Sequence, residues 1–109
     1  MFLSINVILE RFEEMITKNK VVYFSKPGCS LCVKLDEYLL KNQINDFVKI
    51  DLYEMDDDEG LDILDHLKKN FTITTFPICF VESKFVGTFG DMVEHFDKKN
   101  TFSETIDDV

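Results

Sequence analysis

Residues 21–32, VVYFSKPGCSLC, constrain the fold more than any other stretch, because two cysteines follow directly on a short apolar run and a Pro-Gly pair. The β-branched and aromatic residues that open the stretch predict a buried strand, and the Pro-Gly pair ends it. Apolar residues then recur at helical spacing from Cys29 to about Lys41, which predicts a helix. This strand–turn–helix places Cys29 at the helix N-terminus and Cys32 one turn further in.

Hydrophobic periodicity divides the remaining chain into helices and strands without a repeat or a linker. Helical spacing predicts helices over about residues 4–16, over 61–71 and from about residue 90, whereas alternation and short apolar runs predict strands over 47–52, 76–81 and 84–86. The resulting order, α-β-α-β-α-β-β-α, predicts an α/β fold in which helices flank a four-stranded mixed sheet on both faces. The first two strands are expected to be parallel through a right-handed crossover.

The whole chain, residues 1–109, is predicted to be a single domain with a core of about residues 4–100, a length sufficient for one hydrophobic core. Ser4 is the predicted N-cap of the first helix. The acidic tail, residues 101–109, is expected to fray. Four apolar side chains of the third helix are predicted to face inward: Leu61, Leu64, Leu67 and Phe71.

The formal net charge of −9 argues against nucleic-acid backbones and anionic membranes as partners. The N-terminal sequence has neither a basic region nor a clean apolar core, and no apolar run approaches the roughly 20 residues that a membrane span needs. We therefore expect a cytoplasmic monomer in a reducing compartment. In such a compartment a CxxC pair is more often catalytic or metal-binding than a structural disulfide.

The helix N-terminus gives Cys29 a chemical advantage over Cys32. Unpaired backbone N–H groups and the positive end of the helix dipole stabilise a thiolate there. Lys26, three residues upstream, adds a positive charge, so both effects are expected to lower the pKa of Cys29. Cys32 is expected to be more buried and protonated. The pair can close to a disulfide, so Cys29 is the predicted nucleophile and Cys32 the resolving cysteine.

A tetrahedral zinc site is the competing interpretation of the cysteine pair, and it needs two more ligands. Cys79, His66 and His95 are scattered along the chain, and a second CxxC is absent. Cys79 alternates with Phe80 in a predicted strand and is interpreted as a core thiol. Both histidines are interpreted as surface or half-buried residues.

The acidic run at residues 54–59 resembles a calcium loop only superficially. With Gly60 at the invariant glycine position, Met55 and His66 occupy the first and last ligand positions, where carboxylates are required. We therefore interpret the run as a solvated loop whose aspartates cap the next helix.

Three separate segments resemble the glutaredoxins, thioredoxin-fold enzymes that use glutathione. They are SKPGCSLC (25–32), with a lysine three residues before the first cysteine, TFP (75–77), similar to the family's Thr-Val-Pro with its cis proline, and GTFGDM (87–92), similar to its Gly-Gly-x-x-Asp-Leu. The order of elements agrees from about residue 4 to residue 100. A CxxC pair alone is weak evidence, whereas three segments in register on the expected elements are strong evidence.

The resemblance implies a glutathione groove beside Cys29. Lys26 would pair with the carboxylate at the glycine end, and the backbone of Phe76 would bond to the cysteine of the tripeptide as a strand does. Gly90 N–H and the Asp91 carboxylate would hold the γ-glutamyl end. Each residue also has a structural interpretation, such as a solvated lysine or a helix-capping aspartate. The implied groove residues are Lys26, Leu31, Thr75, Phe76, Pro77, Phe89, Gly90 and Asp91.

Several residues depart from the family pattern. Ser30 and Leu31 replace the usual Pro-Tyr between the cysteines, which frees an N–H near the thiolate and changes the redox potential. Family members with serine at this position sometimes bind a [2Fe-2S] cluster, so a cluster-bridged dimer acting as carrier or sensor stays open as a minor alternative. Gly28 replaces a larger residue, Thr88 replaces the second glycine of its motif, and Phe76 is bulkier than valine.

The function that the resemblance implies is that of a dithiol glutaredoxin, which reduces protein disulfides and glutathione mixed disulfides with glutathione as reductant. Its partners would be glutathione and disulfide-bonded or glutathionylated proteins, with ribonucleotide reductase as a candidate by family analogy alone. Two rival functions stay open. One is a thioredoxin-like reductant recycled by a flavoprotein reductase, and the other is a non-catalytic thioredoxin-fold binding module.

Overall fold

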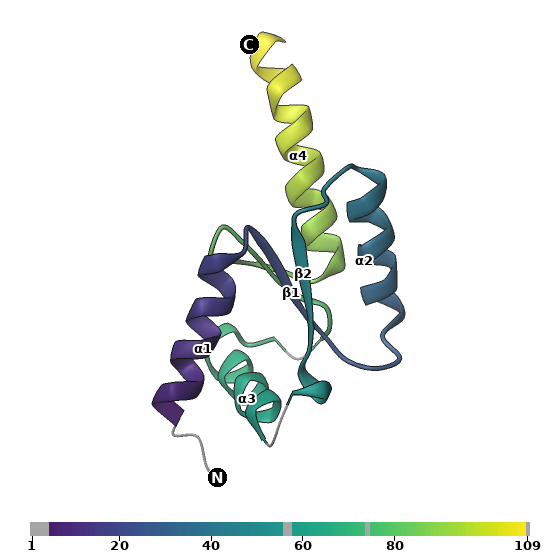
Figure 1. The fold of residues 1–109 in the computed structure, drawn as a ribbon. Helices are drawn as coiled ribbons and strands as arrows, with labels where there is room; N and C mark the ends of the chain where they lie inside the picture. The colour runs from purple at the N-terminus through teal and green to yellow at the C-terminus, as the bar shows by residue number, and fades with distance from the viewer. Residues whose placement is uncertain (1–4, 56–57, 74, 109) are drawn as a thin grey trace.

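A four-stranded mixed sheet in the order β2-β1-β3-β4 forms the centre of the protein (Figure 1). The computed structural model describes residues 5–55, 58–73 and 75–108, with side chains described for these residues from 7 to 98. The elements are α1 (Ile5–Lys18), β1 (Val21–Ser25), α2 (Ser30–Lys41), β2 (Phe47–Asp51), the 3-10 helix η1 (Leu52–Glu54), α3 (Glu59–Phe71), β3 (Ile78–Val81), β4 (Lys84–Gly87) and α4 (Phe89–Asp108). This confirms the predicted order. Ser4, the predicted N-cap of α1, lies outside the described residues.

Strand β1 occupies the middle of the sheet and is buried along its whole length. It runs parallel to β2, with Val21 opposite Phe47, and antiparallel to β3, with Val21 opposite Val81. Helices α1 and α3 cover one face of the sheet, and α2 and α4 cover the other (Figure 1). A strand covered on both faces has no polar side, which explains the uninterrupted apolar sequence that opens the CxxC stretch.

Phenylalanine rings fill the layer between the sheet and the α1–α3 pair. Phe12 of α1 stacks on Phe24 of β1 and meets Phe80 of β3 edge-on, with ring centroids 5.7 and 5.6 Å apart. Phe71 of α3 contacts Phe80 and Phe85, and these rings extend the cluster to β4. Edge-to-face and offset contacts of this kind are the favoured arrangements of aromatic pairs.

The β3–β4 hairpin turns at Glu82 and Ser83, as predicted. Both residues have positive φ angles, +50° and +70°, which is the geometry of the type I′ turn favoured in two-residue hairpins. Glu82 N–H donates to the Lys20 carbonyl at 2.7 Å, and Ser83 Oγ donates to the Ile16 carbonyl at 3.2 Å. These bonds fasten the hairpin to the end of α1.

The face that α3 presents to the core differs from the prediction at one position. Leu61 is 55% exposed, whereas Ile63, Leu64 and Leu67 are buried. The cause is Gly60, whose backbone lies so close to the Leu52 carbonyl that a Cβ there would overlap it. This contact turns the glycine side of α3 inward and leaves the neighbouring Leu61 on the solvent side.

The acidic run before α3 also differs from the prediction. Asp58 occupies the N-cap position, but its side chain makes no capping hydrogen bond. Glu59 is not solvated: it is 7% exposed, and its carboxylate accepts from the Arg11 guanidinium at 2.6 Å. Residues 56 and 57 lie outside the described residues. One carboxylate of the run thus joins α3 to α1.

Helix α4 continues through the acidic tail to Asp108 and projects beyond the sheet and the other helices (Figure 1). The backbone of residues 101–108 is therefore helical in this structure. Within the described residues, no helix combines the length and the apolar character needed to cross a membrane.

We expect Arg11→Ala to lower the free energy of unfolding by about 1–3 kcal/mol, because it leaves the buried Glu59 carboxylate without its partner. The measurement is urea unfolding at neutral pH. Lys18→Ala is the matched control, since the Lys18–Glu14 pair is 70% and 60% exposed and its loss should cost less than about 0.5 kcal/mol. Equal losses for the two variants would contradict the role assigned to the Arg11–Glu59 pair.

Candidate active site at the N-terminus of α2

Cys29 is the N-cap residue of α2, as the sequence predicts. Its φ and ψ angles are −86° and 101°, and its Sγ accepts a hydrogen bond from the Cys32 N–H at 3.2 Å. Gly28, with φ of +74°, supplies the left-handed turn that connects β1 to this cap. The sulfur therefore takes the place that a serine or aspartate oxygen takes in an ordinary helix cap.

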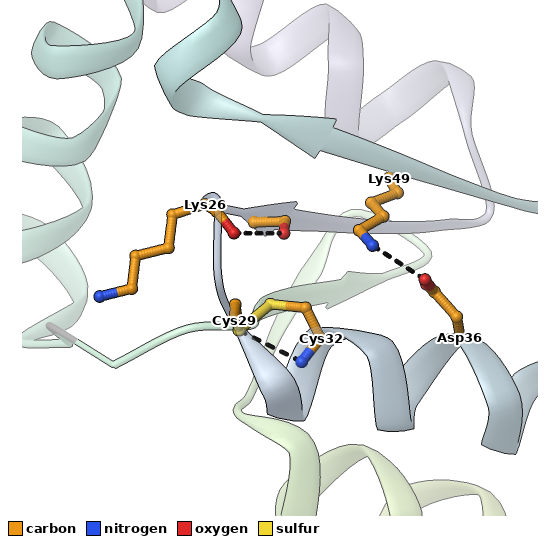
Figure 2. Close-up of a disulfide and its surroundings, with 6 residues drawn as sticks. Lys26, Cys29, Cys32, Asp36 and Lys49 are labelled. Carbon is orange, nitrogen blue, oxygen red and sulfur yellow. Dashed lines mark hydrogen bonds and ion pairs between the residues drawn. A yellow bond between two sulfur atoms is a disulfide. The ribbon is translucent and has the colours of Figure 1, made fainter.

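Cys29 and Cys32 form a disulfide across the first turn of α2, with Cα atoms 5.3 Å apart (Figure 2). Cys29 is half-buried, whereas Cys32 is 1% exposed and belongs to the hydrophobic core. A thiol reagent or a client disulfide can therefore reach Cys29 but not Cys32. In the reduced protein, the Cys32 N–H that points at Cys29 Sγ would stabilise a thiolate.

The Lys26 side chain extends toward the loop that precedes β3. Figure 2 shows its side chain directed away from the disulfide, and its Nζ lies 5.5 Å from the centroid of the Phe76 ring. The contact brings Lys26 against that loop, as a cation over an aromatic face.

The loop before β3 contains the cis peptide bond that the resemblance implies, between Phe76 and Pro77. Thr75 is exposed, and Pro77 is buried. Phe76 is 6% exposed. The larger ring therefore packs in the interior and contacts Lys26, and it offers little exposed area to a client. Leu31 is 38% exposed in the first turn of α2.

At the N-terminus of α4, the Asp91 carboxylate reaches back to Thr88, the residue before the helix, which is one half of a capping box. Thr88 N–H and Thr88 Oγ1 donate to Asp91 Oδ2 at 2.9 and 3.3 Å, and the Thr88 carbonyl accepts from the Met92 N–H at 3.0 Å. Gly87, with φ of +134°, lies directly under the Asp91 carboxylate, where a Cβ would overlap it. Gly90 is exposed and Phe89 is half-buried. Thr88, which departs from the family's second glycine, is thus an N-cap residue.

Asp91 therefore has a structural role in addition to the ligand role that the sequence suggests. Within the described part of the chain, both hydrogen bonds of its carboxylate go to Oδ2, so Oδ1 still has capacity to accept a further donor. The side chain is exposed. Asp91 can therefore hold Thr88 through one carboxylate oxygen and accept from a ligand through the other.

Cys79 lies opposite Gly87 in the β3–β4 pair and is completely buried. Burial, and to a lesser degree the charge of Asp91, raises the pKa of the Cys79 thiol well above its usual range. It is therefore an unreactive core thiol. Among the described residues, no three His, Cys, Asp or Glu side chains converge on a point where they would hold a metal ion.

Two cavities lie near these residues. One, of about 320 Å³, opens beside Cys29 and is lined from the β2 side by Lys49 and Asp51. The other, of about 650 Å³, lies between β4 and α4 and shares only Asp91 with the predicted groove. The larger cavity is thus remote from the cysteine pair, and the smaller one borders the chemistry.

A buried central strand that leads into a helix capped by a half-buried cysteine, beside a cis-proline loop, defines the class of thioredoxin-like thiol–disulfide oxidoreductases. The glutaredoxin family profile matches residues 21–86. Glutaredoxin-1 of Rhizophagus irregularis is 34% identical over 87 residues, which are 79% of this chain and 82% of that protein. The chain belongs to the glutaredoxin family.

Solved structures of glutaredoxins have the same fold. The holo form of glutaredoxin C1 from Populus tremula x tremuloides has a TM-score of 0.75 at 22% identity, with 94% of this chain and 99% of that chain covered. The buckwheat glutaredoxin–glutathione complex has a TM-score of 0.74 at 24% identity, with 87% and 84% covered. This likeness confirms the thioredoxin-like architecture.

Sequence reasoning missed a bond that holds together the two helices carrying the predicted site. The Tyr38 hydroxyl of α2 donates to Asp97 Oδ1 of α4 at 2.8 Å and to the Val93 carbonyl at 3.4 Å. Desolvation, the hydrogen bond to Asp97 and the Asp97 charge raise the pKa of Tyr38 to about 12. The two residues lie 59 positions apart, so neither periodicity nor a motif indicates this pair.

We expect the free energy of unfolding to decline between pH 10 and about pH 12 partly through Tyr38. Its pKa is raised from 10.0 to about 12 in the folded protein, so the folded state keeps a proton that the unfolded state loses over this interval. The Tyr38 contribution is complete below pH 10 and lost as the pH rises. Urea unfolding of wild type and Tyr38→Phe across this range measures it, and the difference between the two should shrink with rising pH. A constant difference would mean that the phenol does not titrate as stated.

Proposed function

We propose that this protein is a glutathione-dependent oxidoreductase that reduces protein disulfides and glutathione mixed disulfides through Cys29 and Cys32. The observation that carries the proposal is the hydrogen bond from the Cys32 N–H to Cys29 Sγ, which marks Cys29 as the sulfur that the helix N-terminus can stabilise as a thiolate. The half-buried position of Cys29 and the burial of Cys32 support the assignment of nucleophile and resolving residue.

With a glutathionylated client, the Cys29 thiolate attacks the glutathione sulfur of the mixed disulfide. A Cys29–glutathione bond forms, and the client sulfur leaves as a thiolate that takes a proton from water. A second glutathione, as its thiolate, then attacks the glutathione sulfur of that bond. Cys29 thiolate is restored, and glutathione disulfide leaves.

With a client that contains a disulfide, the Cys29 thiolate bonds to one client sulfur and the other leaves as a thiolate. Cys32 loses its proton and attacks Cys29 Sγ, which frees the first client sulfur and forms the Cys29–Cys32 disulfide of this structure. Two glutathione molecules return the pair to the dithiol and leave together as glutathione disulfide. The client gains two electrons and two protons.

The glutathione groove is proposed to lie between the cis-proline loop and the start of α4. The Lys26 ammonium, which lies over the Phe76 ring, would bind the carboxylate at the glycine end, and the Phe76 backbone would make strand-like bonds to the tripeptide. Gly90 N–H and Asp91 Oδ1 would take the γ-glutamyl carboxylate and ammonium. The buckwheat relative, solved as a complex with glutathione, supports this use of the family fold.

We propose disulfide-bonded and glutathionylated proteins as clients, with ribonucleotide reductase as one candidate, and a monomer acting in the cytoplasm. Cys29 is the one accessible cysteine among the described residues, since Cys32 and Cys79 are buried. A single chain therefore offers one thiolate to an iron–sulfur cluster, and none of the structural observations favours a cluster over thiol exchange.

The test of the mechanism is turnover of a small glutathione mixed disulfide with glutathione, glutathione reductase and NADPH. We expect Cys29→Ser to abolish activity, because no other accessible thiol replaces it, and Cys32→Ser to retain it, because glutathione can resolve the Cys29 intermediate. Cys79→Ser serves as the control for a buried thiol. Unchanged activity in Cys29→Ser would refute the assignment of Cys29 as nucleophile. Reduction of the protein by a flavoprotein reductase directly, without glutathione, would identify a thioredoxin-like reductant.

A second test separates the two roles of Asp91. Asp91→Asn keeps an oxygen for Thr88 but removes the charge that would hold the γ-glutamyl ammonium, so KM for the mixed disulfide should rise about threefold to tenfold. Thr88→Ala removes the hydroxyl that donates to Asp91 and keeps the Asp91 carboxylate. We expect it to lower the thermal midpoint with little change in KM. Lower midpoints with unchanged KM in both variants would leave Asp91 as a helix cap alone.

A further inference from the structure

The cleft on the β2 side of Cys29 shares Lys26 with the proposed glutathione groove and extends from there to β2. Its volume is about 320 Å³, and its wall combines the β1–α2 turn, the exposed face of the first turn of α2, and two side chains of β2. The lining residues that can recognise a ligand are Lys26, Cys29, Val33, Lys49 and Asp51. Val33 is 50% exposed, so the cleft offers an apolar surface one turn away from the nucleophile.

Lys49 is held in place at the wall of this cleft. Its ammonium donates to Asp36 Oδ2 of α2 at 2.8 Å, and Figure 2 shows this pair on the opposite side of the disulfide from the Lys26 ammonium. Asp36 Oδ1 is buried without a hydrogen-bond partner among the described residues. An ammonium has three donors, and the Lys49 side chain is 36% exposed, so it can bind a second acceptor.

The charged residues that line the cleft are Lys26, Lys49 and Asp51, so cations outnumber carboxylates in its wall. The Asp51 carboxylate already accepts from the Tyr53 N–H at 2.8 Å as the cap of η1. The chain as a whole carries a net charge of −9, so this cleft is a local exception to an acidic surface. Because exposed charges are screened beyond about 8–10 Å, the local cations rather than the distant acidic residues act on a group inside the cleft.

We propose that this cleft binds the polypeptide of a disulfide client on the far side of its attacked cysteine, and that Lys49 selects an acidic residue there. The inference rests on the proposed function, since it concerns the client that Cys29 attacks. Cys29 Sγ bonds to one client sulfur while the other client sulfur leaves as a thiolate. Because Cys29 itself lines the cleft, the client chain next to the attacked cysteine can occupy it.

The spacing along α2 sets the expected position of the acidic residue. Asp36 lies seven residues after Cys29, which corresponds to about 10 Å along the helix at 1.5 Å per residue. An extended client chain advances about 3.3 Å per residue. A carboxylate two or three residues from the client cysteine would therefore reach the Lys49 ammonium, with an apolar neighbour placed against Val33.

The test uses three short peptides, each with an intramolecular disulfide, that differ only in whether Glu, Gln or Lys stands three residues from each cysteine. The measured quantity is kcat/KM with glutathione, glutathione reductase and NADPH, divided by the rate of uncatalysed reduction of the same peptide. We expect the wild type to prefer the Glu peptide to the Gln peptide, and the Gln peptide to the Lys peptide. Each step should be about twofold to fivefold, the range of exposed ion pairs, and should weaken with salt.

Variants of Lys49 and Asp36 distinguish recognition of the client peptide from a structural role of the Lys49–Asp36 ion pair. Lys49→Glu should reverse the order of the Glu and Lys peptides, and Lys49→Met should abolish the preference. Asp36→Asn should strengthen the preference for Glu, because it removes the anion that competes for Lys49. A purely structural role for the Lys49–Asp36 pair would instead make all three variants lose activity equally on all peptides. Lys69→Glu, at the ion pair with Asp65 on α3, is the matched control and should leave the preference at the wild-type value.

Two results would overturn the inference: no preference for the Glu peptide in the wild type, or the same preference in Lys49→Glu and Lys69→Glu. Circular dichroism of each variant confirms folding, and Lys49→Met provides the readout if Lys49→Glu does not fold. Failure of the wild type to turn over the small glutathione mixed disulfide would sink the proposed function itself. Turnover of that substrate without peptide preference would remove only the client-recognition role of Lys49.

Discussion

The burial of β1 on both faces is the constraint on which the rest of the structure depends. A strand enclosed by two layers of helices cannot shift its register without moving apolar side chains out of the core. Its last residue, Ser25, is buried, and the chain reaches Cys29 through the tight turn at Gly28. The position of the nucleophile is thus determined by the packing of the sheet, and the turn itself stays exposed to clients.

The packing of the sheet also determines where the cis-proline loop and the start of α4 lie. The cis peptide at Pro77 precedes β3, the antiparallel neighbour of β1, and the Thr88–Asp91 hydrogen bonds follow β4. Three loops at strand ends therefore carry the cysteine pair, the cis-proline and the α4 N-terminus. Each loop adjoins a strand of the same sheet, so all three are attached to one shared core.

The elements and the cysteine pair could be predicted from the sequence because their signals are local. A β-branched run followed by Pro-Gly and Cys29 specifies the strand, the turn and the helix cap within twelve residues. The direction of Lys26 could not be predicted, since the ring of Phe76 attracts it from fifty positions away. Leu61 was assigned to the wrong face because close contact between Gly60 and the Leu52 carbonyl, rather than helical periodicity, sets the rotation of α3. The sequence also did not reveal three side-chain pairs, Arg11–Glu59, Asp36–Lys49 and Tyr38–Asp97. Polar side chains follow no period along the chain that would indicate their distant partners.

Helix α2 is fastened at its middle on two sides, to β2 through Asp36 and to α4 through Tyr38. Both attachments lie beyond the first turn of α2, which carries the cysteine pair. The disulfide is thus formed within the N-terminal turn, ahead of both points of attachment. Gly28, Ser30 and Leu31 all lie before these attachments, so the immediate surroundings of the cysteines can change among related proteins while the body of the helix keeps its anchors.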